Sequence, residues 1–330
     1  MQHELIHGGE LDRMQALFPQ VSAPWIDLST GINPWPYRAS GISANIHYRL
    51  PTTTAYENCR LALATAINAP PESVCLAPGS ELLIRMLPQW LGCARIAVLR
   101  PSYAEQCSAW QRKYCTVIKT ANPLDHADEV DAIVVSNPNN PDGRLFRCDE
   151  LKAAQKRLAS HGGWLIVDEA YADLMPELSL VQAGGTRGLI VLRSFGKFYG
   201  LAGLRLGAII APPRLCDEVS AKLGAWSVSS AALEIGAQAY LDLDWQQETR
   251  RLLEHARRCL DKVLVSCYLK IVGGTDLFRL VCHEDAEATW HRLALAGIYV
   301  RKFTQIPHHL RIGLPANDAE LERLKVALSP

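Results

Sequence analysis

The sequence predicts an α/β fold in which a mostly parallel sheet lies between helices, followed by a smaller α+β unit. Between residues 57 and 212, segments with helical periodicity alternate with short runs that are apolar throughout and rich in β-branched residues. Such runs are typical of strands buried on both faces, and their alternation with helices is typical of a parallel sheet. The chain has 330 residues, which is enough for one large unit and one smaller unit with separate cores.

Apolar runs and helical periodicity set the expected order of the elements. Helices are expected at residues 57–68, 80–91, 102–114 and 149–160. Strands are expected at residues 95–99, 132–135, 164–167, 189–192 and 207–210. After Pro212 and Pro213 the pattern predicts a helical region at 213–265, then strands at 276–282, 298–301 and 309–313 and helices at 285–296 and 318–328. We therefore expect an N-terminal arm at 1–28, a large domain at 29–212 and a small C-terminal domain at 213–330.

Charge and cysteine content argue against several classes of protein. Lys plus Arg and Asp plus Glu both number 34, whereas proteins that bind nucleic acid or a membrane surface normally carry a basic excess. The ten cysteines include no C-x-x-C pair, so we expect no metal or redox motif and a reducing, cytoplasmic setting. Residues 1–7 lack the apolar run of a signal peptide, and no stretch approaches the length of a membrane span.

Reactive side chains lie next to four of the predicted strands. Residues 136–143, 168–171 and 193–197 each follow a strand, and residues 203–207 lead into one. Polar groups gather at the carboxyl ends of strands in open α/β sheets, so we expect a Lys, an Asp, an Asn, a Tyr, a Ser and an Arg to converge there. Pyridoxal 5'-phosphate (PLP) needs this set. A lysine binds its aldehyde, a carboxylate pairs with its ring nitrogen, and Arg and Ser bind its phosphate.

In order and spacing these residues resemble the fold-type I PLP enzymes, the aspartate aminotransferase superfamily. The matching motifs are Asn140-Pro141-Asp142-Gly143, Asp168-Glu169-Ala170-Tyr171, Ser194-Phe195-Gly196-Lys197 and Arg205. The resemblance implies that Lys197 carries PLP as a Schiff base and that Asp168 holds the ring nitrogen. It further implies that the cofactor's 3'-oxygen is bound by Asn140 and Tyr171, and its phosphate by Ser194 and Arg205.

Two earlier pieces of the chain also match this superfamily. Gly79-Ser80-Glu81 looks like the turn whose amides, at a helix N-terminus, hold the phosphate. Tyr103 looks like the aromatic ring that stacks on the pyridine. Each piece alone has an ordinary structural interpretation, such as a turn, a helix cap or core packing. Together, in order over about 130 residues, they favour a PLP site.

Within the superfamily the chain looks most like the decarboxylases of L-threonine O-3-phosphate in cobalamin synthesis. The match includes residues 7–9, 27–34, 198–207 and 226–228, and two C-terminal arginines. A substrate with a carboxylate and a phosphate calls for more than one guanidinium. The resemblance implies that Arg311 holds the carboxylate. It implies further substrate contacts from His7, Gly8, Asn33, Asn140 and Arg301. Taken alone, His7 fits a terminal arm and Asn33 fits a plain turn.

The sequence departs from these relatives at three positions. Gly196 replaces a Ser or Thr, Asp142 replaces a Thr, and Leu50 replaces a Tyr that reaches the partner subunit's cofactor. Tyr48 and Tyr56 are the candidates to take over from that Tyr, and a homodimer remains the expectation. Two alternatives stay open. One is a histidinol-phosphate aminotransferase, whose substrate has no carboxylate. The other is a PLP-binding regulator without turnover, which would place a DNA-binding domain ahead of this fold.

Overall fold

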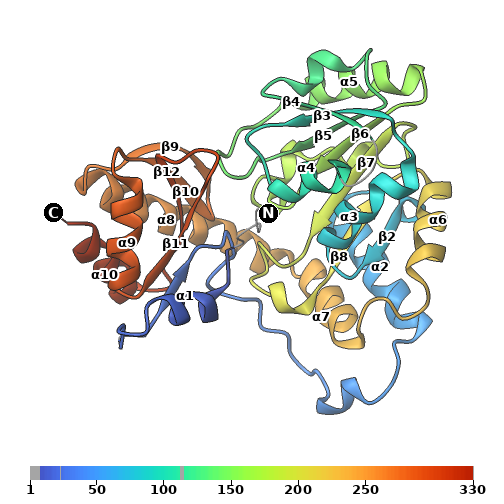
Figure 1. The fold of residues 1–330 in the computed structure, drawn as a ribbon. Helices are drawn as coiled ribbons and strands as arrows, with labels where there is room; N and C mark the ends of the chain where they lie inside the picture. Colours follow the sequence, from blue (N-terminus) through green and yellow to red (C-terminus); the bar gives the residue numbers. More distant parts are fainter. Residues whose placement is uncertain (1–7, 23, 112–114, 330) are drawn as a thin grey trace. The chain divides into compact units, whose positions relative to one another are not determined.

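The computed structural model describes residues 8–22, 24–111 and 115–329, and in it the chain forms two compact units (Figure 1). The larger unit comprises Pro36–Asn140 and Arg144–Gln246. The smaller unit comprises Met1–Trp35, Pro141–Gly143 and Gln247–Pro330. The predicted domain boundaries after residues 28 and 212 stay predictions, and the compact units divide the chain at other positions.

A seven-stranded sheet forms the centre of the larger unit, with strand order β2-β8-β7-β6-β5-β3-β4. The strands are β2 (Val74–Ala77), β3 (Arg95–Leu99), β4 (Thr116–Thr120), β5 (Ala132–Ser136), β6 (Trp164–Asp168), β7 (Leu189–Ser194) and β8 (Gly207–Ile210). β3 to β7 pair in parallel, whereas β8 runs antiparallel to both β2 and β7. The predicted α/β fold with a mostly parallel sheet is confirmed.

Helices cover this sheet. They are α2 (Thr53–Ile67), α3 (Ser80–Leu91), α4 (Ala104–Gln111), α5 (Cys148–Ser160), α6 (Pro213–Leu223) and α7 (Ser230–Leu241). Short 3-10 turns lie at Ala44–His47, Pro71–Ser73, Pro123–His126, Ala172–Leu174, Pro176–Leu178, Val181–Ala183 and Ala202–Leu204. Because α6 packs beside β2 and α7 packs on α2, both belong to the larger unit, although the sequence places them in the small domain.

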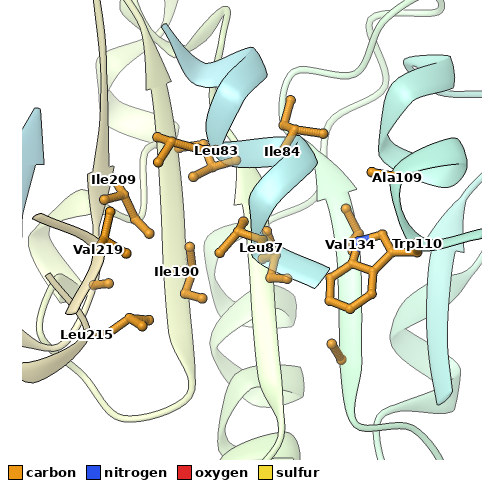
Figure 2. Packing of buried hydrophobic residues seen from close by; sticks show 14 of the residues in the cluster. Leu83, Ile84, Leu87, Ala109, Trp110, Val134, Ile190, Ile209, Leu215 and Val219 are labelled. Carbon is orange, nitrogen blue, oxygen red and sulfur yellow. The ribbon is translucent and has the colours of Figure 1, made fainter. Parts of the chain in front are cut away.

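The central strands are buried on both faces, as their continuous apolar runs predict. Every residue of β5 is buried, so alternate side chains enter two different layers of packing. One layer lies under α3, α4 and α6. Figure 2 shows Leu83, Ile84 and Leu87 of α3 over the strands, with Val134 and Trp110 nearby. This packing fixes α3 on the sheet and places its N-terminus just after the end of β2.

The helical region predicted at 213–265 is three helices rather than one. Gly224 ends α6 with a φ of +76°, a left-handed conformation that favours glycine. Ser229 then caps α7, because its side chain accepts a hydrogen bond from the amide of Ala232. Asp242 separates α7 from α8 (Leu243–Ser266). Across residues 8–22, 24–111 and 115–329, no helix has the length and apolar character needed to cross a membrane.

The smaller unit contains a five-stranded sheet in the order β1-β11-β12-β10-β9. Its strands are β1 (Ile26–Leu28), β9 (Lys270–Thr275), β10 (Phe278–Cys282), β11 (Ile298–Lys302) and β12 (His309–Gly313), and its other helices are α1 (Leu11–Leu17), α9 (Ala286–Leu295) and α10 (Asp318–Leu328). β1 pairs in parallel with β11, so the segment expected to be an arm contributes a strand to this sheet. The remaining pairs are antiparallel.

Candidate active site

Several chain segments meet at one edge of the seven-stranded sheet, which we call the carboxyl edge because β5, β6 and β7 end there. Asp168 is the last residue of β6, and Ser194, the last residue of β7, lies opposite Gly207 of β8. Because β8 runs against β7, the residues that precede β8 reach the same edge as those that follow β7. Lys197 and Arg205 lie between these two strands, so both belong to the carboxyl edge.

The carboxyl group of Asp168 is buried and held by two donors. Gln106 Nε2 donates to Oδ2 at 2.8 Å, and the amide of Ala170 donates to Oδ1 at 3.2 Å. Burial raises the pKa of Asp168 from 3.8 to about 6, against the opposing effects of these two hydrogen bonds and the charge of Lys197. A cation placed beside this carboxyl group would favour its ionised form, as the ring nitrogen of PLP requires.

The turn before α3 and the segment before β8 pack tightly together. Gly79 has a φ of +90°, and a Cβ at this position would lie 2.8 Å from Arg205 Nη2, so the guanidinium covers the Gly79 Cα. A Cβ on Gly207 would lie 2.6 Å from the Ser80 nitrogen, so the backbones also approach closely. The arrangement joins a helix N-terminus to a guanidinium, two features that bind phosphate.

Tyr103 is positioned by a hydrogen bond to the side chain of Glu81, the second residue of α3. Its hydroxyl donates to Glu81 Oε2 at 2.9 Å, and Glu81 Oε1 accepts from Arg85 Nε at 2.6 Å. Burial and the Glu81 carboxylate both raise the pKa of Tyr103, so its hydroxyl stays protonated. The side chain of Glu81 therefore fixes the position of the Tyr103 ring.

The other predicted cofactor residues lie where the chain leaves the sheet. Tyr171 is buried and follows β6 by three residues, and Ser194 is half-buried at the end of β7. Asn140 is half-buried and is the last residue of the larger unit before Pro141–Gly143. The roles assigned to Asn140, Tyr171 and Ser194 stay predictions.

A buried network of ion pairs links β7 to the segment that follows β6. Arg193 of β7 contacts Glu169 Oε2 through Nη1 at 3.1 Å and contacts Asp173 through its other terminal nitrogen. Glu169 also accepts from the amide of Leu180 at 2.7 Å and from the hydroxyl of Ser179. Because this network joins the residues after β6 to β7, it fixes the segments that bear Tyr171 and Lys197.

In the smaller unit, the two predicted substrate arginines lie directly opposite each other on β11 and β12. Arg301 pairs with Arg311 in the strand register. Arg311 is buried, with its guanidinium carbon 5.2 Å from the centre of the Phe278 ring. Burial and the charge of Arg311 lower the pKa of Arg301. Like charges placed opposite each other on neighbouring strands are unfavourable, so an anion bound here would relieve the repulsion.

Ser29 connects this arginine pair to the start of the described chain. Arg311 Nη2 donates to the carbonyl of Ser29 at 2.6 Å, and the Gly9 amide donates to Ser29 Oγ at 2.8 Å. A Cβ on Gly8 would lie 2.5 Å from the same carbonyl, so only glycine fits there. Asn33 is buried, and its Oδ1 accepts from the Trp35 amide at 2.9 Å, as in a turn.

The predicted residues therefore fall into two groups. The cofactor candidates lie in the larger unit, while Gly8, Asn33, Arg301 and Arg311 lie in the smaller unit; His7 is outside the described residues. Gln106, the third residue of α4, was not predicted as a functional residue, because no motif in the sequence includes it.

Comparison with known proteins identifies the family to which the chain belongs. The family described as aminotransferase class I and II matches residues 48–328. The chain belongs to this family. It is 38% identical to the threonine-phosphate decarboxylase of Pseudomonas aeruginosa, over 98% of this chain and 97% of the relative. It is also 37% identical to the threonine-phosphate decarboxylase of a Sinorhizobium species, over 100% of this chain and 99% of that relative.

A solved structure confirms the fold. The histidinol-phosphate aminotransferase of Sinorhizobium meliloti, solved in complex with PLP, superposes with a TM-score of 0.81 at 19% identity and covers 98% of this chain and 94% of its own. The expected fold-type I architecture is confirmed by this likeness.

Proposed function

We propose that this protein is a PLP-dependent decarboxylase that converts L-threonine O-3-phosphate to (R)-1-amino-2-propanol O-2-phosphate for cobalamin biosynthesis. The observation that carries the proposal is the opposed pair Arg301 and Arg311, which suits a substrate with two anionic groups. Similarity to two threonine-phosphate decarboxylases along nearly the whole chain supports it.

The residues of the carboxyl edge fit PLP. Asp168 is a buried carboxyl group that gains from a neighbouring cation, and Gly79 leaves room for a guanidinium at a helix N-terminus, where a phosphate binds well. Asp168 would hold the ring nitrogen, Arg205 and the turn at Gly79 would hold the phosphate, and Lys197 would bind the aldehyde carbon. When bound, PLP supplies a protonated ring that accepts the electron pair left on the substrate Cα when CO2 departs.

Further cofactor contacts come from the same segments. Tyr103 would stack on the ring, positioned by its hydrogen bond to Glu81, and Asn140 and Tyr171 would bind the 3'-oxygen. Ser80 and Ser194 would add donors to the phosphate. The backbone amide of Glu81 would bind the phosphate, as expected for this turn, while its side-chain carboxylate would point to Tyr103 because a carboxylate and a phosphate repel each other.

The protein's own groups then do three tasks during decarboxylation. Arg311 would hold the substrate carboxylate and so orient the bond from Cα to the carboxylate carbon, which is the bond that breaks. Arg301 would hold the substrate phosphate, with the Gly8 amide, Asn33, Asn140 and His7 as further donors. Lys197 would return a proton from its Nζ to the substrate Cα, at the position that the carboxylate leaves.

The test follows CO2 release and keto product separately. The parent should release CO2 from O-phospho-L-threonine and should not transaminate histidinol phosphate. Arg301→Ala should raise KM for O-phosphothreonine more than for threonine, which lacks the phosphate, and Arg311→Lys should lower kcat because the planar fork is lost. Arg258→Ala is the matched control, since the Arg258 side chain lies on α8 and is 64% exposed.

Three results would contradict the proposal. Transamination of histidinol phosphate by the parent, without CO2 from O-phosphothreonine, would make the protein an aminotransferase. Equal losses for threonine and O-phosphothreonine in Arg301→Ala would remove the phosphate role of Arg301. A protein that binds PLP but turns over none of these substrates would fit a regulator instead.

We also propose a homodimer with an intersubunit contact from Tyr48. Tyr48 is 80% exposed and Leu50 is 62% exposed, as expected of residues that a partner covers. Tyr56, the other candidate, is occupied within its own unit, because its hydroxyl accepts from the Leu76 amide at 3.0 Å. Sedimentation of the purified protein tests this, and a monomer at micromolar concentration would contradict it.

A cytoplasmic location is likewise our proposal. All ten cysteines are free thiols in the structure. Burial raises the pKa of five of these thiols and so disfavours their reactive thiolate form: Cys59, Cys75, Cys107, Cys148 and Cys216. Fractionation of cells with an antibody to the protein would test this location.

A further inference from the structure

The side-chain amide of Gln106 has every hydrogen-bonding group in use. Nε2 donates to Asp168 Oδ2 at 2.8 Å and to Ser136 Oγ at 2.8 Å, while Oε1 accepts from Ser102 Oγ at 3.2 Å. Gln106 is 1% exposed. An ionised carboxylate only accepts hydrogen bonds, and Ser102 occupies the amide oxygen, so the amide has one favourable orientation.

A small cavity lies beside Gln106 and Asp168, and the rest of its lining is apolar. The apolar lining residues are Ile84, Leu87, Trp110, Val134, Ile166 and Leu192. A water molecule in such a cavity would find few polar partners. On this side, Asp168 therefore depends on Gln106 for a hydrogen-bond donor.

We propose that Gln106 is a positioning residue for Asp168, which keeps the carboxylate ionised and oriented so that the ring nitrogen of bound PLP stays protonated. The inference rests on PLP as the cofactor, as proposed above, and adds a residue that none of the sequence motifs includes. Ser102 and Ser136 fix the orientation of the Gln106 amide, because Ser102 donates to its oxygen and Ser136 accepts from its nitrogen. Gln106 acts through Asp168 and is assigned no contact with PLP.

Charged groups around Asp168 also influence whether its carboxyl group is ionised. Lys197 favours the ionised carboxyl, whereas Glu81 opposes it, and the protonated Tyr103 lies close enough to interact with Asp168. Removal of the Gln106 donor leaves these groups unchanged and destabilises only the ionised carboxylate. The ring nitrogen would then lose part of its counter-charge and release its proton at a lower pH.

The experiment uses holoenzyme reconstituted with PLP carrying 15N in the ring. Gln106→Leu should move the 15N resonance toward that of the neutral ring and should lower kcat by roughly tenfold or more, with a smaller change in KM. Ser102→Ala, a smaller change, should move the resonance in the same direction by less. Gln155→Leu is the matched control, because Gln155 is also buried in the larger unit but donates to the Arg187 carbonyl.

The resonance is recorded without substrate, so its outcome does not depend on which reaction the enzyme catalyses. An unchanged resonance in both Gln106→Leu and Ser102→Ala, with PLP bound, would overturn the inference. An equal shift in Gln155→Leu would also overturn it, because any loss of a buried amide would then have the same effect. Failure of the parent to bind PLP would instead overturn the proposed cofactor.

Discussion

The buried carboxyl group of Asp168 should destabilise the protein when PLP is absent. Its pKa is raised from 3.8 to about 6, chiefly by burial. At about 1.4 kcal/mol per pKa unit, this shift amounts to about 3 kcal/mol of lost stability at neutral pH. Asp168→Asn removes the charge but turns one acceptor oxygen into a donor, which sacrifices about 1 kcal/mol of hydrogen bonding. We expect a net gain of about 2 kcal/mol for the apoprotein.

The pH dependence gives the sign of this effect. The folded protein binds the Asp168 proton more tightly than the unfolded chain does, so the parent loses stability as pH rises from 3.8 to about 6 and then stays level. Asp168→Asn should therefore stabilise the apoprotein most at about pH 8, and the gain should shrink toward about pH 5. With PLP bound, the parent should be more stable than Asp168→Asn, because the ring nitrogen pairs with the parent carboxylate and not with the neutral amide.

Denaturant unfolding of PLP-free protein, monitored by tryptophan fluorescence at both pH values, measures the effect. Asp244→Asn is the control, since Asp244 is an exposed residue of α8. The reasoning is refuted if apo Asp168→Asn is no more stable than the parent at about pH 8, or if its gain is the same at both pH values.

Two further substitutions test contacts that hold the segments of the candidate site in place. Gly79→Ala places a Cβ 2.8 Å from Arg205 Nη2 on a backbone with φ +90°, so we expect about 1–2 kcal/mol of strain and roughly tenfold weaker PLP binding by absorbance titration. Unchanged PLP affinity would contradict this close contact. Arg193→Met leaves Glu169 and Asp173 buried without their cation and should lower the free energy of unfolding by about 3–5 kcal/mol. A loss below about 1 kcal/mol would show that solvent reaches the network.

The strands that the sequence predicts best are those buried on both faces. β5, β6, β7 and β8 are continuous apolar runs, and their positions agree with prediction to within two residues. β4 escaped prediction because it is a partly buried edge strand with only two apolar residues, Val117 and Ile118, between polar ones. β9 is also at an edge and contains Gly273 and Gly274, which weaken a strand signal.

The candidate site is predictable where chemistry fixes the residue type. Asp168, Lys197 and Arg205 stand next to strands in a recognisable order, so their shared edge follows from the topology. Gln106 differs because any donor of the right length could serve Asp168, and such a role leaves no motif. The contact of Gly79 with Arg205 could not be predicted either, because it depends on the fold of two segments far apart in sequence.

The reversed direction of β8 has a consequence for folding. β7 and β8 form a local antiparallel pair closed by residues 195–206, which carry both Lys197 and Arg205. A short loop closes quickly, so this pairing brings the amine and the guanidinium to the same end before distant strands need to meet. Consider a circular permutant whose new termini lie at Gly200 and Leu201. It would keep all the strand pairings, but β7 and β8 would then be separated in sequence by nearly the whole chain. We expect such a permutant to fold more slowly and to acquire its cofactor site last.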